Sequence, residues 1–135
     1  SKEEAGRVLS QLKIAIRTNY SNPPTHGAAV VAAVLNTPAL RQQWEQELGA
    51  MRVRIKQMRQ ALVEGLQAAG IEQDMSFVTR QIGMFSYSGL SKEQMVRLRS
   101  EYGVYGTDTG RMCVAALNSG NIAYVCESIA KVLAG

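Results

Sequence analysis

The stretch "TPALRQQWEQELGAMRVRIKQMRQALVEGLQAAG", residues 37–70, carries one unbroken apolar stripe. Its members recur every three or four positions: Leu40, Trp44, Leu48, Met51, Ile55, Met58, Leu62 and Leu66. This spacing predicts a single helix from about residue 39 to Ala69. Thr37 is the expected N-cap, Pro38 the first helical residue and Gly70 the C-terminal stop.

The length of this helix bears on domain organisation. A helix of about 31 residues would be about 46 Å long, whereas a compact domain of 135 residues has a diameter of roughly 35 to 40 Å. Such a helix either pairs with a partner as a coiled coil or braces this part of the chain against a second domain. Because only one long stripe is present, bracing is the favoured interpretation.

Two shorter helices are predicted before the stripe. Ser1 and Glu4 form an S-x-x-E capping box, and the helix that they open should end near Arg17, because prolines follow in "IRTNYSNPP" at 16–24. The segment "GAAVVAAVL" at 27–35 is small and apolar on nearly all sides. This composition predicts a short buried helix.

After the stripe the pattern changes to short strands and helices. The segment "GMFSYSG" at 83–89 predicts a strand, and Ser91 opens a helix through Tyr102, with Gln94 completing a capping box and Gly103 ending it. The remaining expected elements are strands at 104–107 and 111–117, a helix from Asn118 or Ser119, and a loop at 71–81 with at most one helical turn. This order predicts an α/β sandwich, a small sheet covered by helices.

Composition restricts the class of protein. Of the 135 residues, 46% are hydrophobic and 19% charged, which is typical of one soluble globular domain. No apolar run is long enough for a membrane span and no signal pattern opens the chain, so a cytoplasmic location is expected. In that reducing compartment Cys113 and Cys126 are expected to be buried free thiols, with a disulfide between them as the alternative.

The charge pattern argues against nucleic-acid and membrane partners. The net charge is +4, but 15 basic residues are interspersed with 11 acidic ones. The densest basic run is Arg52, Arg54, Lys56 and Arg59, which lacks interleaved aromatic residues and is interpreted as a solvated face. With one histidine and two distant cysteines, no metal site is expected.

Two arginines stand in settings that suit an anion. Arg111 follows the turn glycine Gly110 and opens an apolar strand, where its planar fork could hold a carboxylate bidentately. An edge arginine in solvent is the other interpretation. Arg17, at the predicted helix end, has the same ambiguity.

Several segments together resemble the C-terminal third of the aspartate and aromatic-amino-acid (tyrosine) aminotransferases, pyridoxal-phosphate enzymes of fold type I. They are "IRTNYSNPPTHGAAVVAAVL", "WEQELGAMRVRIKQMRQAL", "QIGMFSYSGLSKEQMVRLRSEYGVY" and "GRMCVAALN". The resemblance covers essentially the whole chain. It implies that 1–36 ends a large domain and includes an interface loop, that 37–70 is the interdomain connector helix, and that 71–135 is the small domain.

The resemblance also implies site residues. Arg111 would grip the α-carboxylate of the substrate, and Phe85 would line the pocket. Arg17 would reach across a dimer interface into the neighbouring active site, to the distal carboxylate of dicarboxylic substrates, or swing away for aromatic ones. Ser21 and Asn22 would lie beside that site. In this chain alone, Arg17 should be exposed and unpaired.

The implied parent enzyme is a homodimer that moves the amino group of aromatic amino acids or aspartate to 2-oxoglutarate. The segments "SKEEAGRVLSQLK" and "GRMCVA" favour the bacterial aromatic branch, whereas "YSNPP" is closer to the aspartate branch. The Schiff-base lysine, the partner of the pyridine nitrogen and the phosphate-binding groups lie upstream in the family. This chain alone should therefore have no catalytic or cofactor-binding residue, bind no cofactor and be inactive.

A competing hypothesis is a noncatalytic α/β module that self-associates through the long helix. The chain also departs from the family pattern at four positions. Gly106, Thr107 and Asp108 stand where relatives usually carry aliphatic residues, and Ala116 stands where glycine is usual. Asp108, three residues before Arg111, could neutralise part of its charge.

Overall fold

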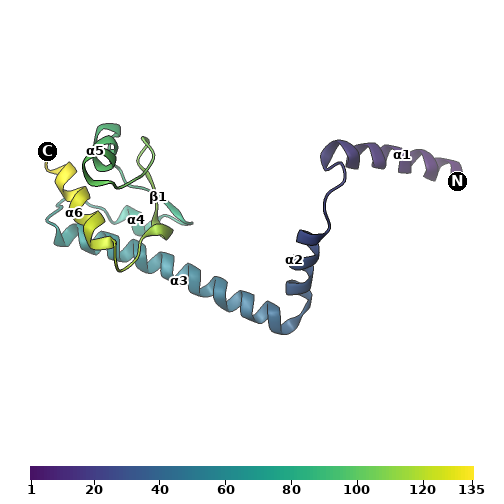
Figure 1. Cartoon of the computed structure of the whole chain (residues 1–135), viewed down its shortest axis with the longest axis horizontal. Coiled ribbons are helices and arrows are strands. Elements are labelled where there is room, and N and C mark those ends of the chain that lie inside the picture. Colours follow the sequence, from purple (N-terminus) through teal and green to yellow (C-terminus); the bar gives the residue numbers. More distant parts are fainter. The chain divides into compact units, whose positions relative to one another are not determined.

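The computed structural model describes all 135 residues, which fall into two compact units, Ser1–Gln46 and Glu47–Gly135 (Figure 1). In chain order the elements are α1 (Lys2–Asn19), α2 (His26–Asn36), α3 (Pro38–Ala68), α4 (Phe77–Arg80), β1 (Phe85–Tyr87), α5 (Lys92–Tyr102), β2 (Arg111–Cys113), the 3-10 turn η1 (Val114–Ala116) and α6 (Ile122–Leu133). Helix α3 begins in the first unit and ends in the second. No helix is long and apolar enough to cross a membrane.

The first helix has the expected cap and a longer C-terminal end. The Glu4 N–H donates to Ser1 Oγ at 3.2 Å, and the capping box is complete. The helix runs to Asn19, beyond the end predicted near Arg17. It stops where Ser21 takes a left-handed backbone (φ 59°) and donates its N–H to the Arg17 carbonyl at 3.1 Å. That geometry is an αL cap made without glycine.

Helix α2 forms at the expected place but is not buried. None of its residues is buried, so the prediction of a buried helix at 27–35 is wrong for this chain. The physical reason is that the whole of the first unit contains no buried residue and therefore no core. Val30 and Val31 remain about half exposed.

The long helix agrees with its prediction to within one residue at each end. Helix α3 has 31 residues and begins at Pro38. It ends in a Schellman motif, in which Gly70 (φ 85°) donates to the Gln67 carbonyl at 3.0 Å and Ile71 donates to the Leu66 carbonyl at 3.1 Å.

The apolar stripe of α3 divides into two halves. Leu62 and Leu66 are buried, and Ile55 and Met58 are partly buried against the core. The other four members are exposed: Leu40, Trp44, Leu48 and Met51. The stripe therefore covers a core only along the C-terminal half of the helix.

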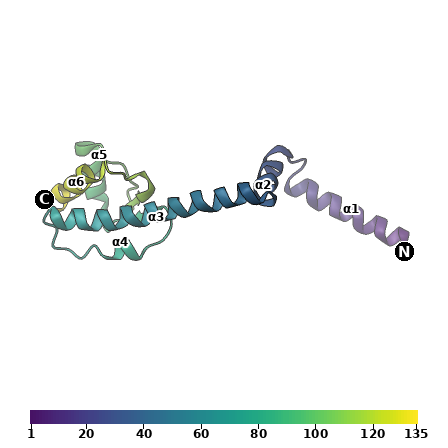
Figure 2. The same cartoon turned by 90° about the horizontal axis from the view of Figure 1, so that it is seen from below.

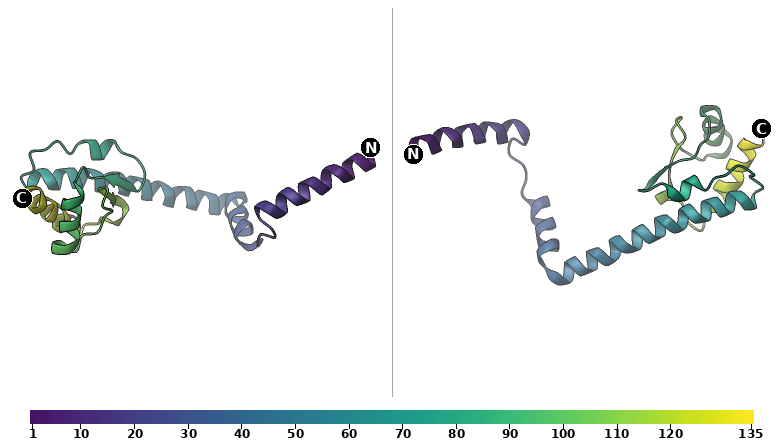
Figure 3. Two further views of the ribbon diagram at one scale, coloured as in Figure 1. Left: turned by 90° about the horizontal axis from the view of Figure 1, so that it is seen from above. Right: turned by 180° about the vertical axis from the view of Figure 1, so that it is seen from behind.

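The second unit carries the core. Its other elements gather along the C-terminal half of α3, with α4 on one side and α5 and α6 on the other (Figures 2 and 3). The face of α6 that the sequence predicted supplies Val125, Cys126, Ile129 and Val132 to this core. Both cysteines are free, although Cys113 is only half-buried; burial, helped by the charge of Glu127, raises the pKa of the Cys126 thiol.

The sheet is a two-stranded antiparallel ribbon, and the α/β class is as expected. Strands β1 and β2 pair with Phe85 opposite Cys113, Ser86 opposite Met112 and Tyr87 opposite Arg111. Ser86 and Met112 face the core, whereas Phe85 and Tyr87 are exposed. The ribbon thus buries a small hydroxyl and shows its aromatic side chains to solvent.

Two predicted strands need correction. Residues 104–107 form no strand, because their one ladder-like bond is that from the Thr107 N–H to the Arg111 carbonyl at 2.9 Å. The strand predicted at 111–117 ends at Cys113 and continues as η1. Strand pairing stops there because the N–H groups of Val114 and Ala115 both donate to the carbonyl of Met84, the residue just before β1.

The ends of the two remaining helices are set by the residues beside them. Helix α5 has the predicted capping box between Ser91 and Gln94, and Gly103 (φ 64°) closes it. Helix α6 begins at Ile122, later than expected. The preceding residues are held in a turn, because the Asn118 N–H donates to Asn121 Oδ1 at 2.8 Å and the Gly120 N–H to Asn118 Oδ1 at 2.8 Å. The loop at 71–81 contains one helical turn, α4, as predicted.

Candidate functional site

The exposed face of the ribbon brings two predicted site residues together. Since Phe85 lies opposite Cys113, Arg111 is its diagonal neighbour on the same face. The guanidinium carbon of Arg111 lies 5.0 Å from the centre of the Phe85 ring. Such a cation–π contact contributes about 0.5 to 1 kcal/mol at an exposed site. It orients the guanidinium plane while leaving its N–H groups available.

The donors of Arg111 are not used by the protein. Its side chain is exposed and makes no hydrogen bond or ion pair within the chain. Asp108, which the sequence offered as a possible partner, accepts a bond from Arg99 of α5 at 3.1 Å and forms no ion pair with Arg111. The fork of Arg111 is left free for an external anion.

A recess of about 240 Å³ surrounds this fork. Its lining residues are Phe85, Tyr105, Gly106, Thr107, Arg111, Met112 and Cys113. Aromatic and thioether surface thus adjoins a single cation, and no acidic side chain lines the recess. This arrangement suits a carboxylate attached to an apolar or aromatic group, because the carboxylate can meet the fork while the rest of the molecule covers the rings.

The other predicted site residues, Arg17, Ser21 and Asn22, lie in the first unit. Arg17 is exposed and has no hydrogen-bonding or ionic partner for its side chain. It lies in the last turn of α1, one turn after Lys13, in an open depression that these two line with Ile14 and Thr18. Ser21 and Asn22 follow in the corner that the left-handed Ser21 creates. Both cations of this depression lack a carboxylate.

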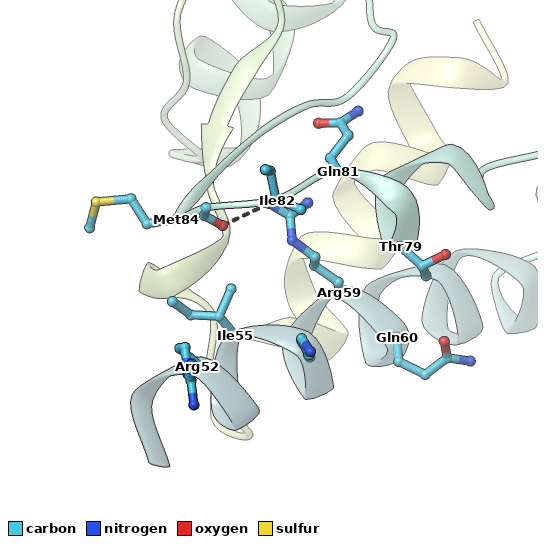
Figure 4. A pocket seen from close by; sticks show the side chains of 10 residues that line it. Arg52, Ile55, Arg59, Gln60, Thr79, Gln81, Ile82 and Met84 are labelled. Carbon is cyan, nitrogen blue, oxygen red and sulfur yellow. Dashed lines mark hydrogen bonds between the residues drawn. The ribbon is translucent and has the colours of Figure 1, made fainter. Parts of the chain in front are cut away.

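A larger cavity, of about 580 Å³, lies beside the same ribbon (Figure 4). Three cations of α3 line it: Arg52, Lys56 and Arg59. The other lining residues are Ile55 and Gln60 of α3, and Thr79, Gln81, Ile82, Gly83 and Met84. Figure 4 shows Arg59 rising from α3 toward this segment. Only 2% of Arg59 is exposed.

Both terminal nitrogens of Arg59 donate to neutral acceptors. It donates to the carbonyls of Val78 (2.9 Å), Gly83 (2.9 Å) and Phe85 (2.7 Å), and to Ser86 Oγ (3.0 Å). Burial lowers the pKa of Arg59. Because these four bonds use both terminal nitrogens, Arg59 fastens the backbone of β1 rather than offering donors to a ligand. It supports the strand that carries Phe85.

The sequence profile of the family described as "Aminotransferase class I and II" matches residues 2–129. The chain belongs to this family.

Among its relatives are two bacterial enzymes with different names. The aspartate aminotransferase of Pseudomonas aeruginosa is 60% identical over 133 residues, which are 98% of this chain and 33% of that protein. The aromatic-amino-acid aminotransferase of Escherichia coli is 52% identical, over 97% of this chain and 33% of that protein. The chain thus spans about a third of the length of these relatives.

Solved structures show the same fold over the same share. The aromatic-amino-acid aminotransferase from Burkholderia pseudomallei, covalently bound to pyridoxal phosphate, has a TM-score of 0.87 and 65% identity, over 98% of this chain and 33% of that one. A mitochondrial aspartate aminotransferase from Trypanosoma brucei has a TM-score of 0.86 and 47% identity, over 98% and 35%. The predicted family and the α/β fold are confirmed.

Sequence reasoning missed the roles of two residues in the basic run of α3. Arg59 is buried, so the interpretation as a solvated face is wrong for it. Arg54 is exposed, as that interpretation expected, but it also donates to the carbonyls of Ala115 (3.0 Å) and Leu117 (2.6 Å). A signal for Arg59 was present. It lies four residues after Ile55 and four before Val63, on the side of the helix that faces the core.

Proposed function

We propose that this chain is the substrate-binding C-terminal third of an aminotransferase that uses pyridoxal 5'-phosphate. The enzyme would move the amino group of an aromatic amino acid or aspartate to 2-oxoglutarate. The observation that carries the proposal is the free guanidinium of Arg111, stacked on Phe85 at 5.0 Å in a recess without acidic residues. Membership of the aminotransferase family supports it.

In this proposal Arg111 binds the α-carboxylate of the amino acid and of the 2-oxo acid through two parallel hydrogen bonds. Phe85 holds the fork and covers the substrate. Arg17, with Ser21 and Asn22 beside it, serves the active site of the second subunit of a homodimer. The exposed and unpaired state of Arg17 agrees with that role.

The proposed organisation follows the same division as the family. Residues 1–36 end the large domain, residues 37–70 connect the two domains, and residues 71–135 form the small domain. We place the enzyme in the cytoplasm, a reducing compartment in which free thiols such as Cys113 and Cys126 persist.

The cofactor would be held by the part of the enzyme that this chain does not span. No lysine lines the recess at Arg111, so the residues present offer no amine for a Schiff base there. When bound, pyridoxal phosphate supplies the electron sink of the reaction. This chain binds and orients the acid, and alone it should not transaminate.

The competing hypothesis of a noncatalytic, self-associating module is not favoured. The family profile covers residues 2–129, which includes both units, and the matching structures cover nearly all of the chain. A module with an unrelated function has no observation of its own in this structure.

The test is a substitution in the intact enzyme. Replacing Arg111 by Ala removes two charge-assisted hydrogen bonds to the substrate carboxylate, a loss of about 3 kcal/mol of transition-state stabilisation. The value of kcat/KM for tyrosine, phenylalanine or aspartate should therefore fall on the order of a hundredfold. Arg52→Ala is the matched control, because Arg52 is exposed and has no partner. It should stay within about twofold of the wild type. An unchanged kcat/KM in R111A would exclude Arg111 from the site.

A further inference from the structure

We infer that Thr107 is the positioning residue of Arg111, and that its hydroxyl group holds the main chain from which the carboxylate-binding fork extends. The inference rests on the proposed role of Arg111. It concerns a residue that does not touch the substrate carboxylate but acts through the residue that does.

The ribbon leaves the main chain of Arg111 without partners on β1. In an antiparallel pair, hydrogen-bonded and non-hydrogen-bonded residue pairs alternate. Ser88 donates its N–H to the Gly110 carbonyl at 2.8 Å, and Val114 donates to the Met84 carbonyl at 2.9 Å. The Tyr87–Arg111 pair is a non-hydrogen-bonded pair in this alternation. The N–H and C=O of Arg111 therefore point away from β1.

Thr107 satisfies both of these groups. The Arg111 N–H donates to Thr107 Oγ1 at 3.1 Å, and the Arg111 carbonyl accepts from the Thr107 N–H at 2.9 Å. The Thr107 carbonyl is not available for this purpose, because it accepts from the Gly110 N–H at 2.9 Å. The side-chain hydroxyl therefore takes the place that a backbone acceptor would have in a third strand.

The segment that carries Thr107 is itself fixed on two sides. Asp108 is paired with Arg99 of α5, and Thr107 Oγ1 lies 2.8 Å from Thr109 Oγ1. Gly106 permits a close approach, because a Cβ atom there would overlap the terminal methyl of Met95 and lie 3.0 Å from the Arg111 carbonyl oxygen. A displacement of Thr107 would therefore pass directly to Arg111.

These contacts give Arg111 two supports of different kinds. Phe85 holds the guanidinium from its face, and Thr107 holds the main chain at the root of the same side chain. Relatives usually carry an aliphatic residue at 107, but with aliphatic neighbours in place of Gly106 and Asp108, so the inference concerns the arrangement of this chain. Val has the shape of Thr but no acceptor, so Thr107→Val keeps the volume and leaves the solvent-exposed Arg111 N–H without its protein partner. A misplacement of about 1 Å in a substrate-positioning group can lower a rate by up to about a hundredfold.

The experiment uses the intact, cofactor-loaded enzyme and three variants: Thr107→Val, Thr107→Ser and the control Thr79→Val. Thr79 is an exposed threonine of α4 whose hydroxyl bonds only the Ser76 carbonyl. The measurements are KM and kcat per loaded site for phenylalanine with 2-oxoglutarate, and the Kd of 3-phenylpropionate, a carboxylate that cannot react. In T107V we expect KM and Kd to rise about five- to twentyfold, with kcat changed less than about threefold.

Rescue and the control separate positioning from stability. Ser keeps the acceptor, so T107S should restore KM and Kd to within about twofold, and T79V should match the wild type. If KM and Kd are unchanged in T107V, the inference is overturned. This holds even if the melting temperature or the number of active sites falls, because such a fall would show only a structural role. If T107V does not fold, Thr107→Ala replaces it, with the same expected rise in KM and Kd, and unchanged values in T107A overturn the inference in the same way.

Arg111→Ala, measured in parallel, distinguishes the two proposals. If R111A raises KM and Kd but T107V does not, the positioning role of Thr107 is wrong and the proposed function stands. If R111A leaves both values unchanged, the carboxylate site itself is wrong, and the inference about Thr107 falls with it.

Discussion

Arg59 is a buried cation that no carboxylate neutralises. Its four bonds go to three carbonyl oxygens and one hydroxyl group, all within 3.0 Å. Taking a guanidinium out of water is costly, and the energy is recovered only when its donors are satisfied. The residue therefore ties α3 to the loop after α4 and to β1 more firmly than an apolar side chain at this position could.

Replacing Arg59 by Met tests this view of the residue. The change keeps most of the volume but leaves the carbonyls of Val78, Gly83 and Phe85 without a donor, so the free energy of unfolding should fall by about 3 to 5 kcal/mol. Chemical denaturation followed by circular dichroism measures it. Arg52→Met, at an exposed position of the same helix, should change it by less than about 0.5 kcal/mol. Equal losses in the two variants would contradict the role of Arg59.

At the scale of single residues, the sequence suggested candidate site residues but not the contacts that support them. The resemblance implied separate roles for Arg111 and Phe85, and the structure adds the contact of 5.0 Å between them. These supporting contacts could not be predicted, because Arg59 bonds main-chain groups 19 to 26 residues away, and the bond of Thr107 to the Arg111 N–H depends on the shape of the turn between them. The sequence pattern of a basic run or of a turn threonine is the same whether these side chains face solvent or bond the main chain of a strand.

At the scale of elements, local signals predicted helix boundaries well and strands less well. Capping boxes, Pro38 and Gly70 are short-range features, and the helices that they bound begin or end close to the predicted residues. Strands depend on partners. Residues 104–107 have a strand-like composition, but a hydroxyl group replaces the ladder bond that would have made them one. The sequence alone could not show that a side-chain hydroxyl group accepts this hydrogen bond in place of a backbone carbonyl.

The cap of α5 permits a quantitative test. Ser91 Oγ accepts from the Gln94 N–H at 3.2 Å, and the Gln94 side chain accepts from the Ser91 N–H at 2.9 Å. Ser91→Ala should lower the free energy of unfolding by about 1 kcal/mol. Ser100→Ala, at an exposed position of the same helix, provides the control and should leave stability unchanged or slightly raised. If both serines behave alike, the cap contributes nothing.

At the scale of the whole molecule, the buried residues are concentrated in the second unit. The first unit has two helices and the start of α3 but no buried residue. Helical periodicity is local and was therefore predictable there. Burial depends on neighbouring surfaces, and none within the first unit covers α2, so its predicted burial was wrong.

The fluorescence of Trp44 can test whether the first unit is uncovered in solution. Trp44 is the one tryptophan of the chain, lies on the exposed half of the stripe and is 44% exposed. In this chain alone its fluorescence should be quenched by acrylamide nearly as strongly in the native state as in urea. Sedimentation in the same buffer should show a monomer at low concentration. A shielded Trp44 in a stable oligomer would instead support self-association through the long helix.

The close approach at Gly106 has a consequence for sequence change in the family. A side chain at position 106 and the methyl of Met95 compete for the same space, whereas the Arg111 carbonyl on the other side is fixed in the ribbon. In a relative with alanine or valine at 106, either the end of the residue 95 side chain turns away or a shorter or branched residue stands at 95. We expect these two positions to co-vary, so that the surroundings of the arginine change by paired replacements while the arginine itself stays.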